Sequence, residues 1–282
     1  MKVLGRVWLN SNKMVNGLFH PGSGLGNMLH RYIATRVLAL DKGYDFGMIG
    51  TGNFKGKSFM DIDFGILPPK EWNYLTDPSG KIIVDTHFDD TKEFNEKTTY
   101  YNPEFNFIKD NTIIDGEFQD ERYFEHRLNE IDQWLTVEPI DIPDDVCVIG
   151  FRGGEFYVFQ ELGLPKSYFE EGIAKMREIN PNMKFEVHTD DPLLARTLFP
   201  DFKITHDIGI NWRSMRYARY AIIANSSFYI LPRLLRNWDD TQDYWAGKDY
   251  TNAVTVAPRY WDRYNLKTWL HPYNYYKSFR YI

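Results

Sequence analysis

The sequence predicts an α/β protein organised in two lobes. The second half alternates apolar runs of strand length with helix-like segments, beginning with "VCVIGF" at 146–151. Alternation of this kind implies right-handed crossovers and a parallel sheet covered by helices. A polar, proline-containing stretch, "DIPDD" at 141–145, separates it from a less regular first half. The 282 residues, 43% of them hydrophobic, suffice for one large domain or two small ones.

The second half is expected to contain five strands and four helices. The clearest helix is 165–180, where Pro165 suits the first turn and apolar residues recur at helical spacing from Tyr168 to Ile179. We expect strands at 146–151, 184–189, 202–205, 221–225 and 253–258, and the other helices at 191–200, 211–220 and 226–237.

In the first half, "HPGSGLGN" at 20–27 leads into a helix that we expect to begin at Asn27. A strand-like "KIIVD" follows at 81–85, and a helix is expected across 121–135.

Composition narrows the class of protein. The formal charge is -6 and the basic residues are scattered, which argues against nucleic acid as a partner. No stretch approaches the ~18 apolar residues of a membrane helix, and the first residues lack a signal-peptide core, so a cytoplasmic protein is expected. The single cysteine, Cys147, is expected to pack in the core. Aromatic residues make up 17% of the chain, which suits either sugar binding or an aromatic core.

Two stretches imitate known motifs. "GTGNFKGKSF" at 50–59 ends like a phosphate loop, but Thr51 stands where that motif needs a glycine, and no helix is expected after it. Asp61 and Asp63 form a short acidic pair of the kind that binds metal in some sugar-transfer enzymes, and such a pair also arises by chance. We therefore expect no metal site.

The glycines of the opening loop allow two interpretations. Gly22, Gly24 and Gly26 lack the spacing of a dinucleotide fingerprint. They could let a ligand anion approach the main chain at a helix N-terminus. They could equally form a tight turn with Asn27 as the helix cap.

Three polar stretches follow expected strands of the second half. "RGGE" at 152–155 offers an arginine, whose planar fork can grip two phosphate oxygens. Asp190 and Asp191 could accept hydrogen bonds from guanine, or Asp190 could cap the next helix. "NSS" at 225–227 places two hydroxyls at a helix N-terminus, which suits either a phosphate cradle or a helix cap.

Taken in order, these stretches resemble one family. "GLGN" at 24–27 with Tyr32 beyond it, the arginine loop, "DDP" at 190–192, "IIANSSF" at 222–228 and "VAPRYW" at 256–261 are similar to motifs of the bacterial α-1,2-fucosyltransferases, glycosyltransferase family 11. The resemblance covers the chain from Gly24 to Trp261, without a match between Gly50 and Asp141.

The resemblance implies a GT-B fold with a cleft between two Rossmann-like lobes. Residues 1–142 would form the acceptor-side lobe and 143–282 the donor lobe, with the last ~20 residues packing back on the first lobe. The donor would be GDP-fucose and the acceptor a glycan hydroxyl, with inversion and without a metal or other cofactor.

Most of the expected site residues carry over from the family by position, whereas Glu155 and Asn225 are expected from their own chemistry and place in the chain. The catalytic residues would be Arg152, Glu155 and Asn27. The donor site would comprise Gly24, Gly26, Asn27, Arg152, Asp190, Asp191, Asn225, Ser226, Ser227 and Phe228.

The chain departs from the family pattern at several positions. Gly150 stands where the family has histidine, Gly153 replaces a second arginine, and Glu155 replaces aspartate. "YILPRLLRN" at 229–237 replaces a tryptophan-rich continuation. A transferase for another GDP-sugar, or a non-catalytic homologue that binds glycan or nucleotide, therefore remains an alternative.

Two further groups of residues have alternative roles. Glu155 is the first candidate for the base, with His20 and His30 as alternatives that are also expected to be structural. Arg213, Arg216 and Arg219 recur along an expected helix as a solvated face, or as a second contact to phosphate or an acidic acceptor.

Overall fold

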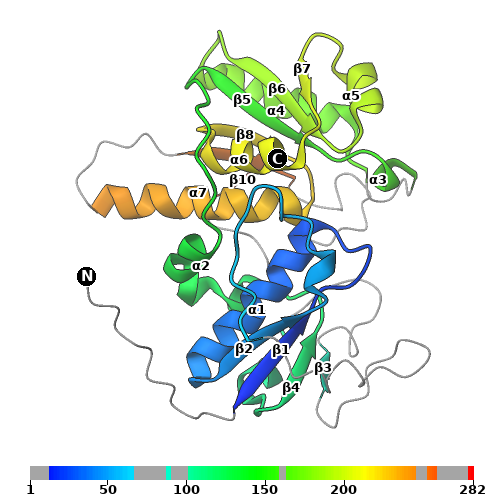
Figure 1. The fold of residues 1–282 in the computed structure, drawn as a ribbon. Helices are drawn as coiled ribbons and strands as arrows, with labels where there is room; N and C mark the ends of the chain where they lie inside the picture. The colour runs from blue at the N-terminus through cyan, green and yellow to red at the C-terminus, as the bar shows by residue number, and fades with distance from the viewer. Residues whose placement is uncertain (1–12, 67–86, 90–100, 159–162, 246–252, 259–278) are drawn as a thin grey trace, which may run out of the picture.

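The computed structural model describes residues 13–66, 87–89, 101–158, 163–245, 253–258 and 279–282. The chain forms two α/β lobes, which lie one above the other in Figure 1. Each lobe contains one parallel sheet. The predicted fold class, parallel sheets flanked by helices in two lobes, is confirmed.

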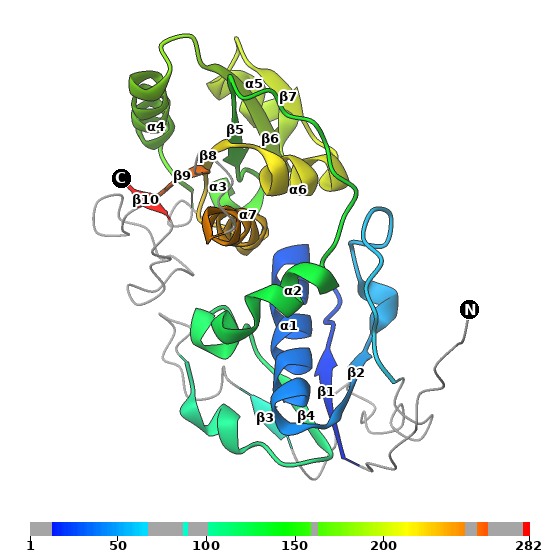
Figure 2. The same ribbon diagram turned by 90° about the vertical axis from the view of Figure 1, so that its left-hand side faces the viewer.

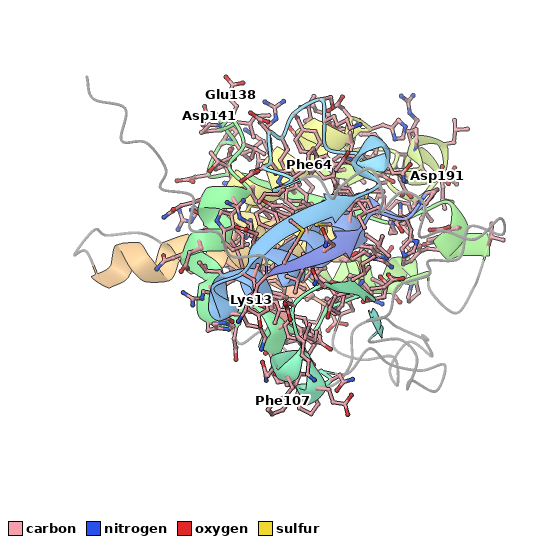
Figure 3. All side chains as sticks on the ribbon, turned by 60° about the horizontal axis from the view of Figure 1, so that its bottom comes forward. Lys13, Phe64, Phe107, Glu138, Asp141 and Asp191 are labelled. Atoms are coloured by element: carbon pink, nitrogen blue, oxygen red, sulfur yellow. The ribbon has the colours of Figure 1, made fainter. Side chains whose placement is uncertain are left out.

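The first sheet consists of four parallel strands in the order β2-β1-β4-β3. These strands are β1 (Met14–Leu18), β2 (Asp45–Ile49), β3 (His87–Asp89) and β4 (Thr112–Asp115). They are short, and the sequence analysis assigned no strand to any of these four segments. The strand expected at 81–85 lies outside the described residues. At the outer edge of this lobe Phe107 projects from the surface and is 79% exposed (Figure 3).

Helix α1 (Leu25–Lys42) joins β1 to β2 and packs against the first sheet. It begins at Leu25 with Gly24 as the N-cap, so the expected start and capping role of Asn27 are wrong. Gly24 is a glycine and therefore has no side chain with which to cap this terminus. The helix ends at Gly43, whose φ of 64° is the left-handed conformation that favours glycine at this position.

The helix expected across 121–135 is broken into three pieces. Only α2 (Leu128–Trp134) is α-helical, and the short 3-10 turns η4 (Glu121–Tyr123) and η5 (Glu125–Arg127) precede it. Phe124 separates the two turns with a φ of -147° and is completely buried. The helical apolar pattern was therefore misleading, because Phe124 lies outside the helical backbone region while its side chain is buried in the core. Two further 3-10 turns are η1 (Thr51–Asn53) and η3 (Pro103–Phe107).

The second sheet contains six parallel strands in the order β10-β9-β8-β5-β6-β7. The strands are β5 (Val146–Phe151), β6 (Lys184–Thr189), β7 (Lys203–Thr205), β8 (Tyr220–Ile223), β9 (Val254–Ala257) and β10 (Arg280–Tyr281). Counted from β5, this is the 3-2-1-4-5-6 order of dinucleotide-binding folds, whose switch point lies between β5 and β8. The five predicted strands are present. β10 was not predicted; it pairs with β9 in the second lobe, while 259–278 lie outside the described residues.

Helices cover both faces of the second sheet. In Figure 2, α4 lies on one side of β5 and α6 on the other. The helices of this lobe are α3 (Glu155–Val158), α4 (Lys166–Ile179), α5 (Pro192–Leu198), α6 (Ile208–Tyr217) and α7 (Ser227–Trp245). α6 begins at Ile208 rather than Asn211, because the Asp207 carboxylate accepts a 2.7 Å hydrogen bond from the Ile210 amide and caps the helix.

Two buried arginines of the second lobe connect its helices to neighbouring helices. Arg216 is 6% exposed and pairs with Asp132 of α2 at 2.5 Å, so the expected solvated arginine face is wrong at this residue. Arg233 is completely buried and donates to the Met215 and Ala218 carbonyls at the end of α6. A cation at a helix C-terminus satisfies carbonyls that the helix leaves unpaired.

The lobes meet where the N-termini of α1 and α7 converge. A side chain at Gly26 would place its Cβ 2.4 Å from the Phe228 amide nitrogen and 2.5 Å from Ser227 Oγ. Real Cβ atoms are essentially never within 3.0 Å of such atoms. Gly26 is therefore required by helix packing. This contact differs from the ligand approach considered for the glycine loop.

We predict that Gly26→Ala lowers the free energy of unfolding by about 2 kcal/mol, because the two helix termini must separate to admit a methyl group. Chemical denaturation followed by circular dichroism measures the change. Gly52→Ala is the matched control, since a Cβ there meets nothing within 4 Å, and it should change stability by less than about 0.5 kcal/mol. Equal stability of the two variants would contradict the close packing.

Candidate functional site

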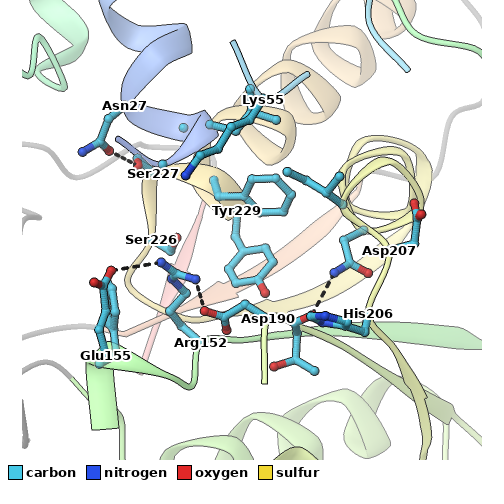
Figure 4. Close-up of a pocket in the computed structure, with 18 of the residues that line it drawn as sticks. Asn27, Lys55, Arg152, Glu155, Asp190, His206, Asp207, Ser226, Ser227 and Tyr229 are labelled. Atoms are coloured by element: carbon cyan, nitrogen blue, oxygen red, sulfur yellow. Dashed lines mark hydrogen bonds and ion pairs between the residues drawn. The ribbon is translucent and has the colours of Figure 1, made fainter. Parts of the chain in front are cut away.

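A cavity of about 560 Å³ lies between the two lobes (Figure 4). Its size is within the range of small-molecule sites in proteins. The first lobe contributes Gly24, Leu25, Gly26, Asn27, Lys55 and Gln119. The second lobe contributes Arg152, Glu155, Phe156, Thr189, Asp190, His206, Asp207, Ile208, Asn211, Ser226, Ser227, Phe228 and Tyr229.

The sheet order explains why these groups converge. Arg152 follows β5, and Ser226 and Ser227 follow β8, the strand that pairs with β5. The carboxyl ends of neighbouring parallel strands meet at one edge of the sheet, and ligands bind at the switch point there. The structure therefore brings Arg152 and both serines to one cavity.

Arg152 lies between two carboxylates in this cavity. Its guanidinium pairs with Asp190 and, at 3.3 Å, with Glu155, and it lies over the Phe156 ring at 4.9 Å. Asp190 also accepts a 2.9 Å hydrogen bond from the Gly153 amide. The charge of Arg152 is thus largely balanced, and an entering anion must compete with a carboxylate for it.

The neighbouring carboxylate has a different role from the one expected. Asp191, not Asp190, is the N-cap of α5 and accepts from the Leu194 amide at 3.0 Å. It also accepts from the Gly154 amide at 3.1 Å. These amide hydrogen bonds lower the pKa of Asp191, with the Leu194 amide contributing most. Asp191 is absent from the cavity lining, so it supports the arginine loop from behind.

Two helix N-termini point toward the same cavity. α1 has no side-chain cap, and α7 begins at Ser227. Ser227 Oγ donates a 2.6 Å hydrogen bond to Asn27 Oδ1, which also accepts from Gln119 Nε2 at 3.1 Å. Asn27 therefore joins the lobes. Helix N-termini favour anions, because their amides are unpaired and the helix dipole is positive there.

At Gly150 and Gly153, neighbouring side chains occupy the space that a larger residue would need. A Cβ at Gly150 would lie 2.8 Å from the Tyr229 ring, so Tyr229 occupies the space of a side chain at 150. The Tyr229 hydroxyl donates toward the carbonyls of Phe151 and His188. A Cβ at Gly153 would lie 2.4 Å from Asp191 Cβ. Neither position can hold a larger side chain without movement of its neighbour.

Some expected site residues lie outside the cavity. Asn225 is 1% exposed, and neither amide atom forms a hydrogen bond with the described chain. His30 is 1% exposed; burial lowers its pKa to about 4, although its hydrogen bond to the Gly26 carbonyl acts in the opposite direction. His20 pairs with Asp115 at 2.8 Å and does not line the cavity. The structure therefore gives His30 and His20 structural contacts.

Cys147, in β5, is buried, and burial raises the pKa of its thiol. A thiol in this environment remains protonated, which agrees with its expected packing role.

Sequence reasoning missed several lining residues. Lys55 lies within the stretch that imitates a phosphate loop, and the real structure there is the 3-10 turn η1 followed by turns. Gln119 lies in the region without family resemblance. His206, Asp207 and Asn211 surround the start of α6, whose boundary was misplaced. A better helix-cap assignment at Asp207 would have drawn attention to that group.

Buried polar groups form the wall behind α6. His188 is 1% exposed, and its Nδ1 donates to Asn211 Oδ1 at 3.0 Å, while Asn211 Nδ2 donates to the Thr189 carbonyl at 3.2 Å. Burial lowers the pKa of His188 to about 4, although Asn211 and nearby Glu186 favour the protonated form. His188 is therefore neutral at pH 7 and fixes Asn211 in the wall.

In the described part of the chain, no three His, Cys, Asp or Glu side chains are grouped so as to hold a metal ion. None of the helices described is both long enough and apolar enough to cross a bilayer.

No protein-family model and no curated protein matches this sequence. Among solved structures, the chain is similar to the fucosyltransferase NodZ from Bradyrhizobium, at 12% identity over 80% of this chain and 94% of that chain, with a TM-score of 0.47. NodZ α-1,6-fucosyltransferase soaked with GDP-fucose gives 12% identity, 80% and 93% coverage, and a TM-score of 0.45. NodZ α-1,6-fucosyltransferase co-crystallised with GDP is 13% identical over 80% of this chain and 93% of that chain, with a TM-score of 0.44.

We predict that the His188 imidazole stays neutral until the pH approaches 4, compared with about 6.5 for an exposed histidine. In the unfolded chain, this histidine takes up its proton near pH 6.5. The free energy of unfolding therefore has its full value above pH 6.5 and falls by about 3 kcal/mol as the pH drops toward 4. The C2-proton shift in an NMR titration, assigned through His188→Gln, measures the midpoint. A midpoint at pH 6 or above would contradict it.

Proposed function

We propose that this protein is a glycosyltransferase that moves fucose from GDP-fucose to a glycan hydroxyl. One observation carries the proposal: Arg152 and the pair Ser226 and Ser227, predicted from two separate stretches of sequence, line a single cavity between two α/β lobes. All of "GLGN" and the "SSF" of "IIANSSF", two stretches that resemble family 11 motifs, line this cavity. The resemblance supports fucose as the sugar and an α-1,2 linkage in the product.

In the proposed reaction, an acceptor oxygen attacks the anomeric carbon on the face opposite GDP. The new glycosidic bond forms as the bond between the sugar and the β-phosphate oxygen breaks, and GDP leaves with the electron pair. Negative charge develops on the diphosphate and is met by Arg152, the Ser226 hydroxyl and the open helix N-termini. Preorganised donors of this kind stabilise developing charge without a metal.

Glu155 is the proposed base that receives the acceptor's proton. Its carboxylate lines the cavity and is paired with Arg152 at 3.3 Å. A diphosphate that binds Arg152 would displace this carboxylate, which then becomes available as a proton acceptor. The base and the leaving-group site are thereby coupled through one guanidinium.

A non-catalytic nucleotide-binding role is the second candidate, because Asp190 and Glu155 already balance Arg152. Calorimetry with GDP, UDP and ADP, followed by an assay for donor hydrolysis, distinguishes the candidates. GDP binding with hydrolysis of GDP-fucose supports the transferase, hydrolysis of another GDP-sugar alone supports a different donor, and GDP binding without turnover supports the second candidate.

We predict that Arg152→Ala lowers kcat/KM for fucosyl transfer by at least ~100-fold, because a preorganised charge donor at the leaving group is lost. Steady-state assays measure the change. Arg196→Ala is the matched control, since Arg196 is exposed on α5 and does not line the cavity. Near-normal turnover of Arg152→Ala would remove Arg152 from the mechanism.

We predict that Glu155→Gln lowers kcat by about 100-fold and removes the low-pH limb of the pH-rate profile, because glutamine cannot accept the proton. Glu170→Gln, on the exposed side of α4, serves as the control. A pH-rate profile identical to that of the wild-type protein would exclude Glu155 as the base.

A further inference from the structure

The loop of residues 51–60 reaches from the first lobe to the second. Phe54 is 3% exposed and stacks on Phe19 with ring centroids 5.5 Å apart, which fixes the loop in the core of the first lobe. Asn53 Nδ2 donates to the Phe19 carbonyl at 2.9 Å. At the other end, a Cβ at Gly209 of α6 would lie 3.0 Å from Phe59. The loop is therefore held at both ends, over the cavity.

Lys55 lies in the middle of this loop and lines the cavity. Gly56 follows it, and a Cβ there would lie 2.5 Å from the Phe54 ring, so the backbone on both sides of Lys55 is constrained. Figure 4 shows its ammonium group directed toward Ser226 and Ser227, with Arg152 beyond Ser226. Lys55 thus faces the same space as Arg152, from the opposite lobe.

The charges lining the cavity make Lys55 distinctive. In the described part of the cavity wall, the lysine and arginine are Lys55 and Arg152, and the carboxylates are Glu155, Asp190 and Asp207. Arg152 is paired with two carboxylates, whereas Lys55 has no ion pair or hydrogen bond with the described chain. Asp207 caps α6 and lies away from the two serines in Figure 4. Among the described residues that line the cavity, Lys55 therefore carries the positive charge that no carboxylate balances.

We propose that Lys55 is a catalytic residue that binds the β-phosphate of the nucleotide from the first lobe and stabilises the leaving diphosphate. It supplies the second cation that the arginine loop cannot provide, because Gly153 has no side chain and Asp191 fills the adjacent space. A lysine ammonium beside the helix N-termini suits a compact phosphate charge. This inference rests on the proposed use of a nucleotide diphosphate.

Calorimetry of Lys55→Met with GDP and GMP tests the proposal, because methionine keeps an unbranched apolar stem of similar size and removes the ammonium group. We expect GDP affinity to fall about 10-fold or more, while GMP affinity changes little, since a charge-assisted hydrogen bond to the β-phosphate is lost. kcat/KM should fall at least as much as GDP affinity. Lys57→Met is the matched control, because Lys57 is in the same loop, donates to the Gly52 carbonyl and does not line the cavity.

Each alternative result has a defined meaning. Equal GDP affinity of Lys55→Met and the wild-type protein overturns the role of Lys55, and a raised KM for the acceptor alone would place it at the acceptor instead. Wild-type binding of UDP or ADP but not GDP refutes the proposed donor, and Lys55 is then tested with the bound nucleotide and its monophosphate. Absence of binding to all three diphosphates overturns both proposals.

Discussion

The close contact between the N-termini of α1 and α7 is the constraint on which the site depends. It requires a residue without a side chain at Gly26, because the Ser227–Phe228 backbone occupies that space. Asn27, the next residue, then reaches Ser227 across the lobes. The contact directs two positive helix ends at one cavity. An anion bound there would contact both lobes and favour the arrangement in which they are together.

Charge in the cavity is divided between the lobes in an unequal way. The second lobe provides an arginine whose carboxylate partners come from the same lobe, so that the guanidinium is held in place before any ligand enters. The first lobe provides the ammonium group of Lys55, which forms no ion pair with the residues that the structure describes. Preorganised charge lowers the reorganisation needed when negative charge develops. Arg152 is oriented before the ligand enters, whereas Lys55 is available to bind the ligand directly.

Where this chain differs from the family 11 motifs that it resembles, at Gly150 and Gly153, a neighbouring side chain occupies the space. Gly150 leaves room that the Tyr229 ring fills, and Tyr229 belongs to the segment that replaces the family's tryptophan-rich continuation. The same segment supplies the buried Arg233, which binds the end of α6. Gly153 allows Asp191 to approach the arginine loop while it caps α5. A larger side chain introduced at Gly150 or Gly153 alone would collide with the neighbour that occupies this space, Tyr229 or Asp191.

The sequence by itself determined the alternating half of the fold and the convergence of Arg152 with Ser226 and Ser227. Local periodicity marks buried strands, and the carboxyl ends of neighbouring parallel strands must lie at one edge of a sheet. Only the tertiary structure decided the bond of Asn27 to Ser227, the place of Lys55 in the cavity wall and the burial of Arg216, together with the assembly of the short strands of the first sheet. Those features depend on contacts between residues distant in the chain, such as Asn27 with Ser227. A local sequence pattern does not indicate which distant segment a residue will contact.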